Sequence, residues 1–99
     1  MTVTEMAQLF DKPDNFSQFC RFSDVVNPPS LRSDLCGMLL LDRLCPSSID
    51  MLIGAGVGRV DFDVNAEDVA RVITEAQVIY LLQCGILFDP ASETFYTNC

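Results

Sequence analysis

Carboxylates, thiols and a run of glycines are the groups in this chain that could take part in chemistry, because the sequence has no histidine and a single lysine. Without histidine, neither a Ser-His-Asp nor a Cys-His arrangement can form. A Ser-Lys arrangement would depend on Lys12 alone, which precedes a proline in a region that reads as a loop. We therefore expect a protein that is not an enzyme and has no catalytic residues.

Two carboxylates, Asp61 and Asp63, stand two residues apart, and Asp68 follows closely. Paired carboxylates can act as general acid and base or bind a hard cation. The alternation of polar and apolar residues from Val60 to Val64 predicts instead a half-exposed strand, whose outward face carries Asp61 and Asp63. We expect a solvated acidic face that meets a basic patch on a partner and no metal site; a carboxylate-metal enzyme is the alternative.

The cysteines stand at positions 20, 36, 45, 84 and 99, with no C-x-x-C pair among them. A structural zinc site needs four N or S ligands, usually in two close pairs, and these spacings do not supply them. The odd count favours free thiols in a reducing compartment. Cys36, Cys45 and Cys84 lie in apolar stretches, which predicts small buried side chains in the core.

The glycines at positions 54, 56 and 58 look at first like a phosphate-binding loop. Such a loop follows a strand and opens a helix. Here Ser47 and Asp50 match a capping box, which predicts a helix through Ile53 before the glycines, and a strand follows them. Since the order is reversed, the glycines predict the end of a helix and a turn, and no cofactor is expected.

The length of 99 residues fits one compact domain, which we divide into an N-terminal helical arm at residues 1–29 and a core at 30–99. No apolar run approaches the length that spans a bilayer, and the N-terminus lacks the features of a signal peptide. These features predict a cytoplasmic protein that does not bind membranes.

Fourteen acidic residues against six basic ones give a net charge of −8. Binding a phosphate backbone requires several cations, so this balance opposes nucleic acid as a partner. Hydrophobic residues make up 49% of the chain, which is more than so small a domain can easily hide. The surplus predicts contact with another protein that has a basic surface, or with a second copy of the chain in a homo-oligomer.

The first half of the chain is predicted to be helical. Thr2 and Glu5 match a capping box in front of a short helix, and Asn15 caps a second short helix that carries phenylalanines. A Pro-Pro pair then marks a connector. The strongest helix runs from Leu31 to Leu44 and is expected to be buried on several sides. Its predicted inward residues are Leu31, Leu35, Met38, Leu39 and Leu41 or Leu44.

The second half is predicted to combine helices with a three-stranded antiparallel sheet, which makes the fold class α+β. Helical spacing runs from Ala66 to Cys84, either as one long helix or as two helices with a turn at Thr74, where a second capping box begins. Two strand-like segments, Ile86 to Phe88 and Thr94 to Thr97, are expected to form a hairpin with a five-residue loop.

This order of strand, helix, turn, helix and hairpin resembles the winged-helix arrangement, with the hairpin as the wing. The resemblance implies a third helix from Glu75 to Cys84 that would enter a DNA groove. That helix has no cation, and the wing contains Asp89 and Glu93, so the phosphate anchors of a DNA reader are missing. The turn at Thr74 also lacks the glycine that such turns often contain. Even as a winged helix, the chain is expected to bind protein.

Together these observations predict a non-catalytic acidic protein-binding module, such as a small inhibitor, adaptor or assembly subunit. The size and charge also suit a viral or phage antagonist of a host protein. The alternative is a winged-helix DNA-binding transcriptional regulator. The candidate protein-binding residues belong to the aromatic segment and to the acidic strand face: Phe16, Phe19, Phe22, Asp61 and Asp63.

Overall fold

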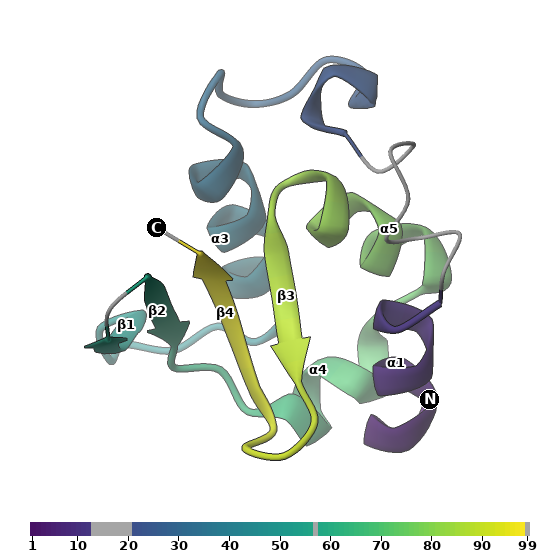
Figure 1. Ribbon diagram of the computed structural model, residues 1–99, viewed down its shortest axis with the longest axis vertical. Helices are drawn as coiled ribbons and strands as arrows, with labels where there is room; N and C mark the ends of the chain where they lie inside the picture. The colour runs from purple at the N-terminus through teal and green to yellow at the C-terminus, as the bar shows by residue number, and fades with distance from the viewer. Residues whose placement is uncertain (13–20, 57, 99) are drawn as a thin grey trace.

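Helices cover one face of an antiparallel sheet in the computed structural model, which describes residues 1–12, 21–56 and 58–98 (Figure 1). Over these residues the chain forms four α-helices, one 3₁₀ helix and four strands, so the predicted α+β class is confirmed. The helices are α1 (Val3–Phe10), α3 (Ser33–Leu44), α4 (Ala66–Val72) and α5 (Glu75–Gln83), with the 3₁₀ helix η1 at Phe22–Asp24. The strands are β1 (Leu52–Gly56), β2 (Arg59–Phe62), β3 (Ile86–Asp89) and β4 (Thr94–Asn98).

The strand order across the sheet is β1-β2-β4-β3, and every neighbouring pair is antiparallel. The β3–β4 hairpin forms where the sequence predicts it. One row of the register places Phe62, Phe95 and Phe88 side by side on the face that the helices cover. The prediction of three strands is wrong by one, because β1 adds a fourth at the edge beside β2.

Three phenylalanine rings join the two ends of the chain in the core. The ring of Phe10, from α1, lies 5.9 Å from the rings of Phe88 and Phe95, and those two are 4.9 Å apart. Met6 is also fully buried, and the N-terminal amine donates a hydrogen bond of 2.9 Å to the carbonyl of Ala70. α1 therefore supplies side chains to the same core as the later elements.

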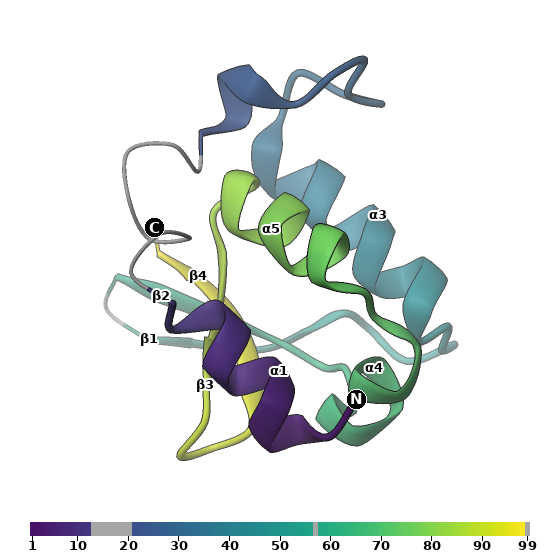
Figure 2. The ribbon, with the colours of Figure 1, turned by 90° about the vertical axis from the view of Figure 1, so that its right-hand side faces the viewer.

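The open question between one helix and two after Ala66 is answered by a break at Ile73, whose backbone is extended. Thr74 caps α5 through a reciprocal capping box, in which its hydroxyl accepts from the amide of Gln77 at 3.2 Å and its own amide donates to Oε1 of Gln77 at 3.0 Å. α5 thereby turns away from α4 and lies between α1 and α3 (Figure 2).

The helix predicted from Ser47 to Ile53 is wrong, because strand β1 begins at Leu52. The hydroxyl of Ser47 accepts from the amide of Ile49 at 3.1 Å, two residues on, which makes a local turn and not a helix cap. The glycines at 54 and 56 lie inside the strand, opposite Asp61 and Arg59 of β2. Poor helix propensity of glycine and the β-branched Ile53 favour this outcome.

Helix α3 forms as predicted but buries a different face. Its buried residues are Cys36, Gly37, Leu40 and Leu41, which confirms the prediction for Leu41. Leu35 and Leu39, which were also predicted to face inward, are exposed. In the described residues the helix packs on α4 and α5, and its Gly37 lies against Ile86 of β3, but its outer face is exposed, so the expectation that it is buried on several sides is also wrong. Gly37 allows this close approach because it lacks a Cβ, and Ile86 and Cys84 occupy the space.

Some predictions fall outside the described residues. The second short helix, with Asn15, Phe16 and Phe19, lies mostly at positions 13–20, and Phe22 begins η1. In the parts of the chain that the structure describes, no helix is long and apolar enough to cross a membrane.

Candidate protein-binding groove

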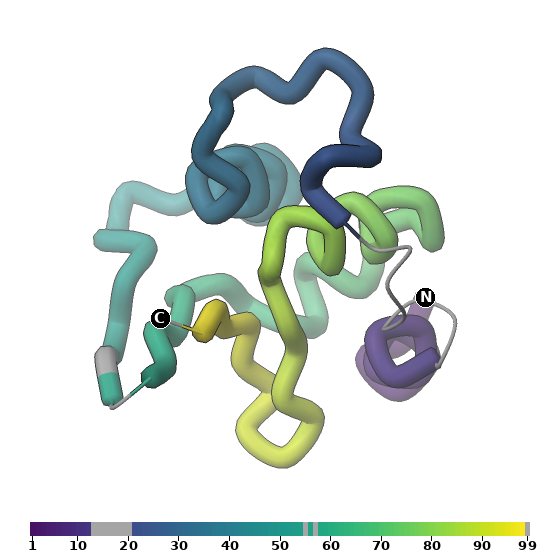
Figure 3. Tube along the Cα trace, turned by 45° about the horizontal axis from the view of Figure 1, so that its top comes forward, coloured from purple at the N-terminus to yellow at the C-terminus, as the bar shows by residue number. Residues whose placement is uncertain are grey.

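An open apolar groove lies between the first half of α3 and the sheet, and we call it the α3–sheet groove. Its volume is about 830 Å³. Residues from α3, from the turn before it and from several strands line it, Arg32 and Asp34 among them. The apolar lining residues are Leu31, Met38, Leu52, Val60, Phe62, Cys84 and Leu87. Figure 3 shows the β1–β2 hairpin standing away from α1 and α5, with α3 above it.

The strand register explains why this end of the sheet is open. Leu52 pairs with Phe62, so both side chains point to the face on which the helices pack. Phe62 is buried there, whereas 55% of Leu52 is exposed, because α1, α4 and α5 stop short of β1. Val60, on the same face, is half-buried. The sheet therefore offers unused apolar surface at its β1 side.

The turn before α3 holds Leu31 at the rim of the α3–sheet groove. The hydroxyl of Ser30 accepts from the amide of Arg32 at 3.1 Å, and the thiol of Cys36 donates to the carbonyl of Ser30 at 3.3 Å. These bonds fix the backbone on both sides of Leu31, whose side chain is 92% exposed. A leucine so exposed on an ordered turn is free to contact another molecule.

The opposite face of the sheet carries an ion-paired cluster around Arg59. Nε of Arg59 donates to Asp61 at 2.6 Å, Nη1 donates to Asp89 at 3.0 Å, and the guanidinium lies 4.0 Å from the ring centre of Tyr96. The hydrogen bonds to Asp61 and then Asp89 raise the pKa of Arg59 above its usual value. The bond from Arg59, followed by the amide of Ala91, lowers the pKa of Asp89.

This cluster neutralises part of the predicted acidic face. Asp61 is one member of an ion pair, with a third of its side chain exposed, and its charge is compensated by Arg59. Strand β2 ends at Phe62, so Asp63 lies just beyond it and is half-buried. The two carboxylates are therefore near one another in sequence but do not form one free acidic face.

The other predicted binding residues are aromatic. Phe22 is half-buried in η1 and packs against the core, so only part of its ring is available to a partner. Phe16 and Phe19 lie outside the described residues.

Two of the cysteines form a buried thiol pair next to Tyr80. Cys36 and Cys84 are each 1% exposed, which confirms the prediction that they are core side chains; Cys45 is only half-buried. Burial, with a contribution from Cys36, raises the pKa of Cys84 to about 11. Burial and the two thiols raise the pKa of Tyr80 to about 12. Cys84 is thus a protonated thiol at neutral pH, which is a poor nucleophile.

The described residues bring together no group of three or more histidine, cysteine or acidic side chains that could hold a metal ion. Asp61 and Asp89 do converge, but on the guanidinium of Arg59, which occupies the position between them. Asp68 faces Arg71 at 3.6 Å, on α4.

The sequence reasoning missed the residues that line the α3–sheet groove. The helical pattern predicts Leu31 as an inward residue, and the capping-box pattern places Leu52 in a helix that does not form. A signal was present in the apolar surplus around α3, which exceeds one helical stripe. Whether those apolar residues face the core or an open groove depends on which elements pack against α3, and the local sequence does not specify that.

No family model, no curated protein and no solved structure matches the chain. The class that the fold and the groove define is an α+β domain with an open apolar groove beside an edge strand.

Proposed function

We propose that this chain is a non-catalytic protein-binding module that holds part of another protein in the α3–sheet groove. The observation that supports this most is the exposure of Leu31 and Leu52 on opposite walls of an ordered apolar groove. Contiguous apolar surface of this kind is typical of sites where proteins meet, because covering it removes it from water. A small inhibitor, adaptor or assembly subunit needs only such a binding surface and no catalytic centre.

The partner is expected to have a basic surface. The net charge of −8 repels another acidic protein, a second copy of this chain included. Of the six basic residues, Lys12, Arg59 and Arg71 already face carboxylates within the chain. The buried Cys36 and Cys84 are free thiols, which supports a reducing compartment such as the cytoplasm.

We further propose a winged-helix-like arrangement for residues 59–98. The order β2, α4, α5, β3, β4 and the sheet order β2-β4-β3 support it, with β3–β4 as the wing and β1 as an addition at the edge. DNA binding, the alternative function, would place α5 in a groove. That helix contains no cation, its first turn has Glu75, and Glu93 lies in the wing loop.

A gel shift with mixed-sequence duplex DNA separates the two functions. We expect no shift at low salt, where phosphate contacts are strongest. The reason is that α5 has no Lys or Arg that could contact phosphates and release counterions from the DNA. Binding that weakens steeply as salt rises would favour the DNA-binding alternative and count against the protein-binding module.

Photo-crosslinking tests the proposed function itself. We expect p-benzoylphenylalanine at position 31 to capture one discrete protein from an extract of the cells that make this chain. Capture should be competed by excess unmodified chain, and a Leu52→Glu competitor should be about tenfold weaker, as for the loss of an apolar anchor.

The control places the same crosslinker at Val72, which is 54% exposed on α4, on another part of the surface. Equal capture from both positions, or competition by Leu52→Glu as strong as by the unmodified chain, would show that the α3–sheet groove is not the binding site.

A further inference from the structure

Among the described residues nothing pairs with the outer edge of strand β1, which carries one register shift between Leu52 and Gly54. In the described residues it pairs with β2 on one side only. The segment Leu52–Gly56 contains no charge and no proline, and Leu52 and Ile53 are each more than half exposed. Natural sheets usually protect such an edge with lysine, proline or a covering element, because its free N–H and C=O groups pair readily with another strand.

The other edge of the sheet is different. Strand β3 packs against α1 and α5, buries Ile86 and Phe88, and ends on the ion-paired Asp89 (Figure 1). Over the described residues, helices therefore pack against one edge strand and leave the other open, and the open edge is the one beside the α3–sheet groove.

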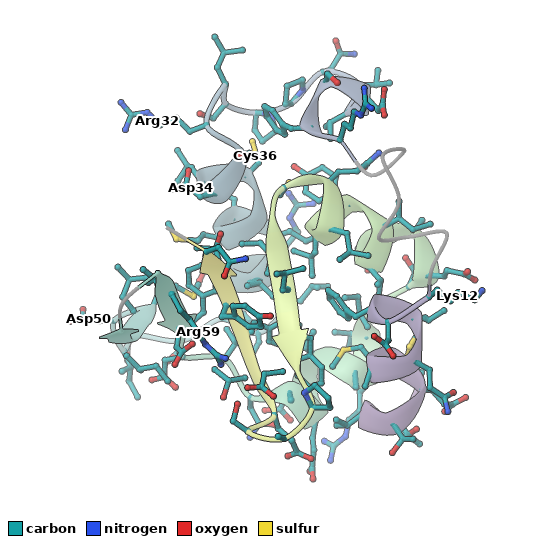
Figure 4. The ribbon with its side chains drawn as sticks, in the orientation of Figure 1. Lys12, Arg32, Asp34, Cys36, Asp50 and Arg59 are labelled. Carbon is teal, nitrogen blue, oxygen red and sulfur yellow. The ribbon has the colours of Figure 1, made fainter. Side chains whose placement is uncertain are left out.

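The charges around β1 favour one kind of strand. Asp50 precedes β1, and Asp61 and Asp63 lie on or after β2; Figure 4 shows Asp50 beside the strand. Against these three carboxylates stands Arg59, which Asp89 also shares, while the groove lining adds one charge of each sign, Arg32 and Asp34. The surroundings of the open edge are thus net negative, so a second copy of this chain is repelled and a basic segment is attracted.

We propose that the partner binds by strand addition: an extended, basic segment of another protein pairs with the free edge of β1. This inference rests on the proposed function and names the partner's chemistry. Backbone hydrogen bonds to β1 supply the pairing, and alternate side chains of the added strand continue the face of Leu52 and Val60 into the α3–sheet groove. Those inward side chains are apolar, because Leu31 and Met38 form the opposite wall. Lysine or arginine at the outward positions or the ends meets Asp50 and Asp63.

Peptides selected from a phage-displayed random library against the full chain test this mode. We expect the selected peptides to alternate apolar residues with others and to contain lysine or arginine. Hydrogen exchange of the β1 amides should slow when a selected synthetic peptide binds, while exchange on β3 stays unchanged. Asp50→Lys should weaken binding about two- to fivefold, as for one exposed charge pair.

Asp24→Lys is the matched control, since it makes the same change in net charge on η1, away from β1, and should leave peptide affinity unchanged. Acidic or non-alternating selected peptides, protection of α3 without β1, or failure to select any peptide would overturn strand addition. If the crosslinker at position 31 still captures a partner in that case, the protein-binding function stands and only its mode is wrong; if both experiments fail, the function fails too.

Discussion

Replacing Phe95 with alanine is expected to lower the free energy of unfolding by about 3–5 kcal/mol, the usual cost of emptying a buried phenylalanine site. The side chain is fully buried and its ring packs on both Phe10 and Phe88, so it connects the first helix of the chain to the last hairpin. Small domains have only about 5–15 kcal/mol to lose. Urea denaturation followed by circular dichroism measures the change.

Tyr96→Ala is the control for this prediction. Tyr96 is the next residue of β4 and points to the other face, where its ring meets Arg59 and remains half-buried. We expect it to cost about 1 kcal/mol, as for a partly exposed ring with one cation–π contact. If Phe95→Ala and Tyr96→Ala lowered the free energy of unfolding equally, the three-ring cluster would not be a main source of core stability.

Elements with strong local signals could be predicted from the sequence. The capping boxes at Thr2 and Thr74 each form with both reciprocal hydrogen bonds, and each starts a helix. The β3–β4 hairpin also forms as predicted. These features depend on residues a few positions apart, so the chain needs no distant contact to specify them.

The errors occur where distant contacts override local patterns. Ser47 and Asp50 have the spacing of a capping box, yet Leu52 and Ile53 join a sheet because β2 lies beside them. A short apolar run fits a helix or a strand equally well by its pattern alone. Pairing across the sheet decides between them, and the sequence of the run does not contain that information.

The candidate site likewise combines contacts that local sequence predicts with contacts that only the fold creates. Arg59 and Asp61 are two apart in a strand, so their place on one face, and hence their ion pair, follows from period-two geometry. Asp89 joins them through the register of β2 on β4 and β4 on β3, which no local pattern gives. The exposure of Leu31 depends likewise on which side of α3 meets the rest of the fold.

Gly37→Val is expected to lower the free energy of unfolding by about 2–3 kcal/mol, the upper part of the range for an overpacked core. A Cβ at Gly37 would overlap Cγ1 of Ile86, and it would lie 3.0 Å from Cδ1 of Ile86 and 3.3 Å from Cβ of Cys84. The helix propensity that valine gains over glycine is below about 1 kcal/mol and does not offset this overlap. Thermal and urea unfolding monitored at the same wavelength would measure the cost.

Gly56→Val is the matched control, because a Cβ added there meets nothing within 4 Å. The same substitution in β1 should change stability by less than about 0.5 kcal/mol, since it fills open space on a strand that favours β-branched residues.

The packing of Gly37 also bears on the proposed function. Gly37 sets how closely α3 approaches the sheet, so a milder Gly37→Ala that still folds should widen the α3–sheet groove and reduce crosslinking from position 31. If Gly37→Val and Gly56→Val changed the free energy of unfolding equally, α3 would not pack closely on Ile86. The position of α3 as a wall of the groove would then not depend on Gly37.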